Sequence, residues 1–169
     1  MRYFHCGSEL FNYTPRKSHE VMIGNRPLGG GHPIRIQSMT TTATTDTEGS
    51  IAQCRAIIEA GGDYVRLTTQ GTIEARALEP IRKALNGAGL TNPLVADVHF
   101  NPNVADVAAT VVEKVRINPG NYVDPARTFK SLEYTDEEYA AELQRLEERF
   151  TRLLDICREH GTALRIGVN

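Results

Sequence analysis

The chain has 169 residues, of which 40% are hydrophobic and 24% charged, and its formal net charge is −2. This length gives one ordinary domain with its own core, but a complete eight-unit (β/α) barrel needs roughly 250 residues. The slightly acidic balance argues against non-specific nucleic-acid binding, which needs a broad basic face. The three cysteines, Cys6, Cys54 and Cys157, have no C-x-x-C spacing and predict neither a disulfide framework nor a zinc site.

Residues 1–20 lack hydrophobic periodicity and predict an irregular N-terminal arm. They contain no apolar segment typical of a signal peptide, and no apolar run reaches the roughly 20 residues of a membrane-spanning helix. We therefore expect a cytoplasmic protein that binds neither membranes nor nucleic acid. Two short apolar segments on either side of Gly24-Asn25-Arg26 predict a hairpin at residues 21–28.

From residue 34 onward, strand and helix signals alternate. Short apolar segments bounded by turn residues predict five strands, at 34–39, 64–68, 94–98, 115–118 and 164–169. Apolar residues at helical spacing predict helices between them, around 51–58, 73–85, 104–111 and 136–160. The first strand-to-strand steps (34 to 64 and 64 to 94) are both 30 residues, the length of a βα unit. The predicted fold class is α/β, with about five parallel strands and covering helices after the arm and hairpin.

The last predicted helix carries a narrow apolar stripe. Its members recur by four and three residues: Tyr139, Leu143, Leu146, Phe150, Leu153 and Cys157. For a single helix we interpret this stripe as a packed face and not as a coiled-coil seam. Cys54 and Cys157 both fall on apolar helix faces, so we expect them to pack in the core.

Each predicted strand has one apolar and one polar side, because successive side chains point to opposite faces. The apolar sides suit packing against helices. The polar sides carry Gln37, Arg66, Thr68, Asp97, His99, Arg116, Asn118, Arg165 and Asn169. Three arginines against one aspartate leave this inner face with a charge of +3 − 1 = +2.

The arginines of the inner face predict anion binding. Buried guanidinium groups are costly without anionic partners, and their forked N–H donors suit phosphate oxygens. Ligands of parallel α/β folds bind at the C-terminal ends of the strands, where His99, Asn118 and Asn169 lie. The turn at residues 118–121 adds backbone amides that could meet a ligand. The alternative is an internal Arg–Asp network completed by water.

Five ordered motifs resemble those of the 4-hydroxy-3-methylbut-2-enyl diphosphate synthase family of the methylerythritol phosphate pathway, and the similarity runs from about Lys17 to Asn169. The motifs lie at 36–40 with 44–46, 63–66, 94–100, 116–121 and 165–169. The resemblance implies that residues 21–169 are the N-terminal part of a TIM-barrel substrate-binding domain. The 49-residue step from 115 to 164 and the helix start at Tyr134 resemble the large three-domain form. We therefore expect a fragment that lacks the later barrel strands, an inserted domain and an iron–sulfur domain.

The resemblance also implies a reaction, the reduction of 2-C-methyl-D-erythritol 2,4-cyclodiphosphate. The ring opens, a hydroxyl leaves as water, and ferredoxin or flavodoxin supplies two electrons. The family's [4Fe-4S] cluster has three Cys ligands and a Glu in a separate C-terminal domain, and no cysteine of this chain lies in a cluster motif. The implied substrate contacts are Arg66, Arg116, Arg165, Asn118 and Asn169. Asp97 and His99 line the same pocket and are the candidate catalytic residues.

The residue pattern is also compatible with two other functions. A pterin-binding barrel of the dihydropteroate synthase type would also place Asn and Asp at strand ends and bind a diphosphate. A non-catalytic half barrel would bind an anion or nothing. For this chain by itself we expect no reductase activity, and its unpaired first and last strands predict a homodimer.

Overall fold

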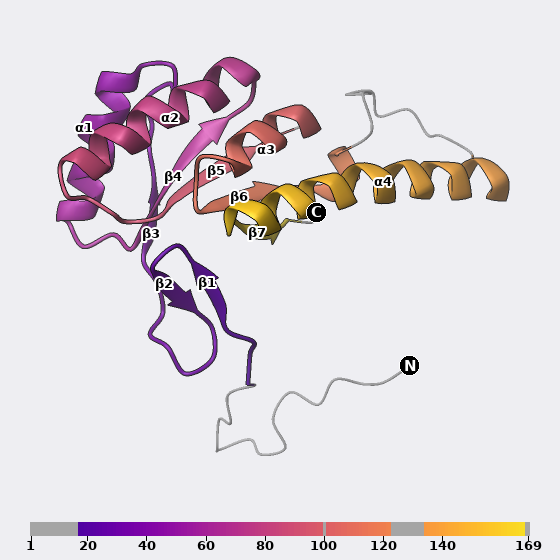
Figure 1. Cartoon of the computed structure of the whole chain (residues 1–169), viewed down its shortest axis with the longest axis horizontal. Coiled ribbons are helices and arrows are strands. Elements are labelled where there is room, and N and C mark those ends of the chain that lie inside the picture. Colours follow the sequence, from indigo (N-terminus) through magenta and orange to yellow (C-terminus); the bar gives the residue numbers. More distant parts are fainter. Residues whose placement is uncertain (1–16, 100, 123–133, 168–169) are drawn as a thin grey trace.

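The structure, a computed structural model, describes residues 17–99, 101–122 and 134–167 (Figure 1). It begins with a hairpin of β1 (Val21–Ile23) and β2 (Arg26–Leu28). The remaining elements, in chain order, are β3 (Gln37–Met39), α1 (Thr47–Glu59), β4 (Tyr64–Thr69), α2 (Thr72–Gly87), β5 (Leu94–Val98), α3 (Pro102–Ala109), β6 (Lys114–Ile117), the 3₁₀ turn η1 (Pro119–Asn121), α4 (Asp136–His160) and β7 (Ala163–Ile166).

The main sheet has five strands in the order β3-β4-β5-β6-β7, and every neighbouring pair is parallel. Each strand therefore pairs with the next strand along the chain, which is the strand order of a (β/α) barrel. This confirms the predicted α/β class and the hairpin that precedes it. The two edges of the sheet are β3 and β7.

Capping residues set the ends of the helices. Asp46 accepts a hydrogen bond from the Gly49 amide at 3.0 Å and starts α1. A capping box of Thr135 and Glu138 starts α4. Gly161 ends that helix in the left-handed conformation, with φ of 67°, which glycine adopts without steric cost.

The main core lies between the sheet and the helices along one of its faces. Six strand residues that face the helices are each at most 3% exposed: Val65, Leu67, Ala96, Val98, Val115 and Ile117. Figure 1 shows α1, α2 and α3 along this side of the sheet. Cys54 and Cys157 are buried in the same core, as predicted.

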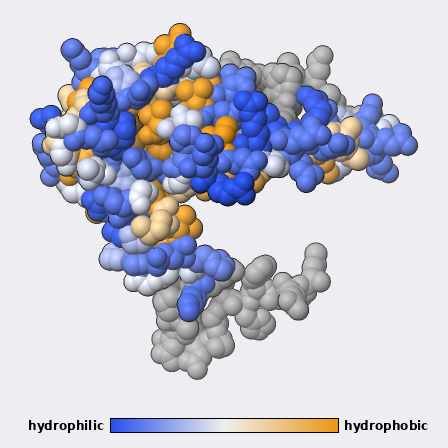
Figure 2. All heavy atoms as spheres, in the orientation of Figure 1, coloured by the Kyte–Doolittle hydropathy of each residue, from blue (hydrophilic) through white to orange (hydrophobic). Residues whose placement is uncertain are grey.

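The part of α4 that packs on this core runs from Leu146 onward. Leu153 and Cys157 are buried, whereas Tyr139 and Leu143, near the start of the helix, are exposed. In Figure 1 the first half of α4 projects past the sheet. The prediction that the whole stripe packs was wrong at its N-terminal end, because the neighbouring α3 has eight residues against the 25 of α4. Figure 2 shows that the projecting part is mostly hydrophilic.

The hairpin covers one end of the other sheet face. Ile23 of β1 is buried with Tyr64 and Val95, which point away from the helices. An ion pair of 2.6 Å between Arg26 and Asp63 ties β2 to the start of β4. The polar inner face therefore has an apolar floor at the N-terminal end of its strands.

Both edge strands are shorter than predicted. β3 begins at Gln37, and Ile34 and Ile36 are 95% and 63% exposed. The Asp63 carboxylate accepts the hydrogen bond of the Ile36 amide at 2.9 Å, so a side chain replaces a strand partner there. β7 ends at Ile166, although the amide of Gly167 still donates to the carbonyl of Ile117 at 2.8 Å.

Some predictions fall on residues that the structure does not describe. These are most of the N-terminal arm, with Cys6, and the end of the last predicted strand. Among the described helices, none has both the length and the apolar character to cross a membrane.

Candidate functional site

The predicted inner-face residues share one side of the sheet. Four of them are successive Cα partners across neighbouring strands: Thr68, Asp97, Arg116 and Arg165. Arg66 precedes Thr68 by two residues on β4 and so points the same way. The alternation in the sequence therefore assigned these residues to the correct face.

Asp97 joins two of the arginines. Nη2 of Arg66 donates to one of its carboxylate oxygens, and Nη1 of Arg116 lies 3.4 Å from the other. The Asp97 side chain is 3% exposed, whereas those of Arg66 and Arg116 are 24% and 19% exposed. A buried carboxylate needs such cationic partners, because burial without them is costly. Asp97 thus holds one guanidinium group of β4 and one of β6 on the inner face.

His99 lies next to this cluster. Its Nε2 is 3.2 Å from Nη1 of Arg116 and 3.9 Å from a carboxylate oxygen of Asp97. A guanidinium can only donate, so Nε2 accepts, and the neutral imidazole carries its proton on Nδ1. The Arg116 contact therefore selects one tautomer of His99.

The other predicted ligand contacts are less closely grouped. Arg165 is exposed beside Arg116, and none of the ion pairs among the described residues includes it. Asn118 accepts a hydrogen bond from the Gly120 amide at 3.1 Å and caps η1. The Gly120 amide, one of those that could meet a ligand, is therefore engaged by Asn118. Asn169 lies outside the described residues.

Lys114 is an inner-face cation that the sequence analysis missed. It is buried, and its Nζ lies 5.5 Å from the centre of the Tyr64 ring. Burial, and then the positive charges of Arg165 and Arg66, lower the pKa of Lys114 below its ordinary value of 10.5. The available signal was its spacing of two from Arg116, but the predicted strand began one residue later, at Val115.

With Lys114, the inner face carries four cations against one carboxylate. The sum for Arg66, Lys114, Arg116 and Arg165 with Asp97 is +4 − 1 = +3. An Arg–Asp network does form, but one aspartate cannot neutralise the group. A ligand with two or more negative charges would lower the mutual repulsion of these cations.

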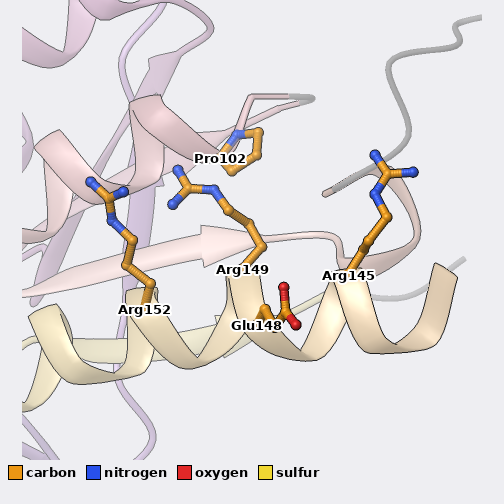
Figure 3. Close-up of a pocket in the computed structure, with 5 residues that line it drawn as sticks. All are labelled: Pro102, Arg145, Glu148, Arg149 and Arg152. Carbon is orange, nitrogen blue, oxygen red and sulfur yellow. The ribbon is translucent and has the colours of Figure 1, made fainter. Parts of the chain in front are cut away.

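A second group of arginines lies on α4, facing the start of α3. Arg145, Arg149 and Arg152 line a pocket of about 420 Å³ together with Pro102 and Glu148, and Figure 3 shows the three arginines along α4. Arg149 and Arg152 both pair with Asp106, at 2.8 and 3.4 Å. Arg145 pairs with Glu142 at 2.6 Å. Because acidic partners are present for these arginines, the pocket is a weaker anion site than the inner face.

The described cysteines do not fit an iron–sulfur cluster. Burial raises the pKa of the Cys54 thiol to about 11 and also raises the pKa of Cys157. Both thiols therefore stay protonated near neutral pH, whereas a metal ligand must be a thiolate. Within residues 17–99, 101–122 and 134–167, no three His, Cys, Asp or Glu residues are grouped to hold a metal ion.

Comparison with known proteins assigns the family. The GcpE TIM-barrel domain matches residues 18–169, nearly the whole chain. The chain belongs to this family. A 4-hydroxy-3-methylbut-2-en-1-yl diphosphate synthase (flavodoxin) of Bacteroides fragilis is 65% identical over 161 residues, which cover 95% of this chain and 26% of that protein. A protein of the same name from Akkermansia muciniphila is 50% identical over 169 residues, covering 100% and 28%.

The GcpE-family chain thus spans about a quarter of the length of these relatives. Among solved structures, 7,8-dihydropteroate synthase from Vibrio fischeri ES114 aligns with a TM-score of 0.46 and 14% identity. That alignment covers 87% of this chain and 65% of the other. A likeness this low carries no argument for a pterin-binding function.

Proposed function

We propose that this chain forms the first part, residues 21–169, of the TIM barrel of a 4-hydroxy-3-methylbut-2-en-1-yl diphosphate synthase. Its inner face binds the diphosphate of 2-C-methyl-D-erythritol 2,4-cyclodiphosphate. The observation that carries the proposal is the pair Arg66 and Arg116 on Asp97, within a group of charge +3 on the inner face of the sheet. The family match and the relatives' names, which state a diphosphate as the product, support a diphosphate ligand.

The charge of the inner face suits the chemistry of ring opening. When the bond between carbon and a bridging phosphate oxygen breaks, that oxygen leaves with an additional negative charge on the diphosphate. Cations fixed before the reaction stabilise such developing charge without reorganising. Asp97 keeps Arg66 and Arg116 in place, Arg165 and Asn118 add contacts, and Asn169 is a further proposed contact. His99, whose Nε2 lies 3.2 Å from Nη1 of Arg116, is the candidate proton carrier.

In this proposal, the groups that transfer electrons lie in other regions of the full-length enzyme. We assign the [4Fe-4S] cluster, the later barrel strands and an inserted domain to the rest of the full-length enzyme, because the described cysteines do not fit a cluster. The cluster would supply electrons to the substrate, and flavodoxin, named for the relatives, is the proposed donor. The enzyme works in the cytoplasm, and this chain by itself has no reductase activity.

We also propose that the chain alone forms a homodimer through its open sheet edges. β3 and β7 have no partner strand on their outer sides among the described residues, and Met39 and Ile166 are exposed there. Sedimentation over a concentration series tests this. A monomer that persists at high concentration would contradict it.

Calorimetric titration with inorganic diphosphate tests the binding function. The chain should bind diphosphate more tightly than orthophosphate, and Arg116→Ala should weaken binding by about 10- to 100-fold, since charge-assisted hydrogen bonds are lost. Arg145→Ala, which removes a paired arginine on α4, is the matched control and should leave affinity unchanged. Equal affinities for Arg116→Ala and the original chain would refute the proposed site.

A further inference from the structure

Gly167, the residue after β7, lies directly against the guanidinium of Arg116. A Cβ placed on Gly167 would be 2.7 Å from Nε, 2.8 Å from Nη2 and 3.1 Å from Cζ of that side chain. These separations are shorter than carbon atoms in folded proteins adopt, so any side chain at this position would move the guanidinium. The space that Arg116 occupies therefore exists because residue 167 has no side chain.

The backbone of Gly167 is itself fixed. Its amide donates to the carbonyl of Ile117 on β6 at 2.8 Å, which continues the strand pairing by one residue. Its φ lies outside the left-handed region, so backbone conformation does not explain the glycine. The close approach of the Arg116 guanidinium is a physical reason for glycine at this position.

Arg116 is also held by Asp97 and His99. Its Nη1 lies 3.4 Å from a carboxylate oxygen of Asp97 and 3.2 Å from Nε2 of His99. Since Gly167 lies against Nε and Nη2 while Asp97 and His99 contact Nη1, the plane of the guanidinium has little freedom. A planar donor fork binds phosphate oxygens in pairs only when its orientation is set.

We propose that Gly167 is a positioning residue: its missing side chain directs the Arg116 guanidinium onto Asp97 and His99 and thereby orients it for an oxyanion. The diphosphate part of this inference rests on the proposed function, whereas the positioning of Arg116 does not. In Gly167→Ala the flexible arginine moves and the sheet stays in place. The variant should keep its fold and lose the Arg116–His99 contact.

The matched control is Gly87→Ala. A Cβ on Gly87, the last residue of α2, would meet no atom within 4 Å. Gly87→Ala adds the same methyl group as Gly167→Ala, but at a position away from the inner face. It should leave both Arg116 and diphosphate binding as they are.

The first experiment is nitrogen-15 NMR of the ligand-free 169-residue chain, read at the ring nitrogens of His99 and at Nε of Arg116. The original chain should show the tautomer of His99 that carries its proton on Nδ1. Gly167→Ala should shift the Arg116 Nε signal and mix the His99 tautomers, and Gly87→Ala should change neither. Unchanged His99 and Arg116 signals in Gly167→Ala would overturn the positioning role, whatever the chain binds.

The second experiment measures inorganic diphosphate affinity in a double-mutant cycle. Gly167→Ala should weaken binding by about tenfold when Arg116 is present, and should have no effect in the Arg116→Ala background. An equal loss in both backgrounds would overturn the inference, because Gly167 would then act through another group. If the original chain binds no diphosphate while the NMR shifts occur, the proposed function fails and the positioning role stands.

A folding defect would also be informative. If Gly167→Ala unfolds because its methyl group meets Arg116, then adding Arg116→Ala should restore the fold. A double variant that also fails to fold would show that the methyl group meets the backbone, and the inference would be wrong.

Discussion

The two faces of the five-stranded sheet are formed by the same strands but differ in the polarity and burial of their side chains. On the helix-facing side, the strand side chains are apolar and almost fully buried. On the inner side, residues two positions apart on the same strands are charged and half-buried around Asp97. The apolar side chains of the outer face need no ligand to be buried favourably. The inner face carries an excess of positive charge, which an anionic ligand would neutralise in part.

This difference separates the face of the sheet that stabilises the chain from the face that we propose binds a ligand. Packing on the outer face is non-directional and tolerates exchange among apolar residues of similar volume. The inner face depends on pairing geometry and net charge, so single substitutions there should change binding more than stability. The following changes test that separation.

The largest loss of stability should come from Leu67→Ala on the outer face. Leu67 is fully buried in β4, so its truncation should lower the free energy of unfolding by about 2–5 kcal/mol. Urea titration measures this, and Thr68→Ala, the next residue on the opposite face, is the comparison. If both variants lost the same free energy, the two faces would not differ as described.

A smaller loss is expected for Asp97→Asn on the inner face. Removing the shared carboxylate leaves two half-buried guanidinium groups unpaired, which should cost about 2 kcal/mol, less than for a fully buried pair because both arginines keep contact with water. Saturating diphosphate should recover part of this loss in thermal unfolding. Asp155→Asn, in an exposed pair with Arg158, is the control and should change stability little. An inner-face loss no greater than this control would argue against the charge cluster.

Lys114→Met should stabilise the chain near neutral pH. The pKa of Lys114 is lowered on folding, first by burial and then by Arg165 and Arg66, so the unfolded chain binds this proton more tightly than the folded chain. The resulting penalty is complete below the folded pKa and disappears as the pH rises toward 10.5. The stability difference between variant and original chain should therefore shrink between neutral pH and pH 10.5. Urea midpoints measured across this range check the sign, and a difference that grows with pH would contradict it.

The smallest change in stability is expected for Arg165→Ala. This side chain is exposed at the edge strand, so the free energy of unfolding should change by less than about 0.5 kcal/mol. Diphosphate affinity should nevertheless fall several-fold, because one cation of the inner face is lost. A stability loss well above 1 kcal/mol with unchanged affinity would instead give Arg165 a structural role.

Much of this arrangement is predictable from local sequence patterns. Where the predictions were wrong, the reasons are physical. Period-two alternation placed Arg66, Asp97 and Arg116 on one face because strand geometry is the same in any sheet. The same rule missed Lys114, since strand ends are set by pairing with neighbours and not by the residues alone. It also overextended the first strand, where Asp63 takes the place of a strand partner for Ile36.

The sequence by itself determined the order of strands and helices, the apolar outer face and the cationic inner face. These follow from side-chain chemistry and from periodicities of 2 and 3.6 residues, which are local properties of the chain. Only the tertiary structure decided that Asp97 joins Arg66 to Arg116, that Arg116 meets His99, and that Gly167 makes room for it. Those contacts link residues 17 to 51 positions apart, and their geometry depends on strand register, which no local pattern contains.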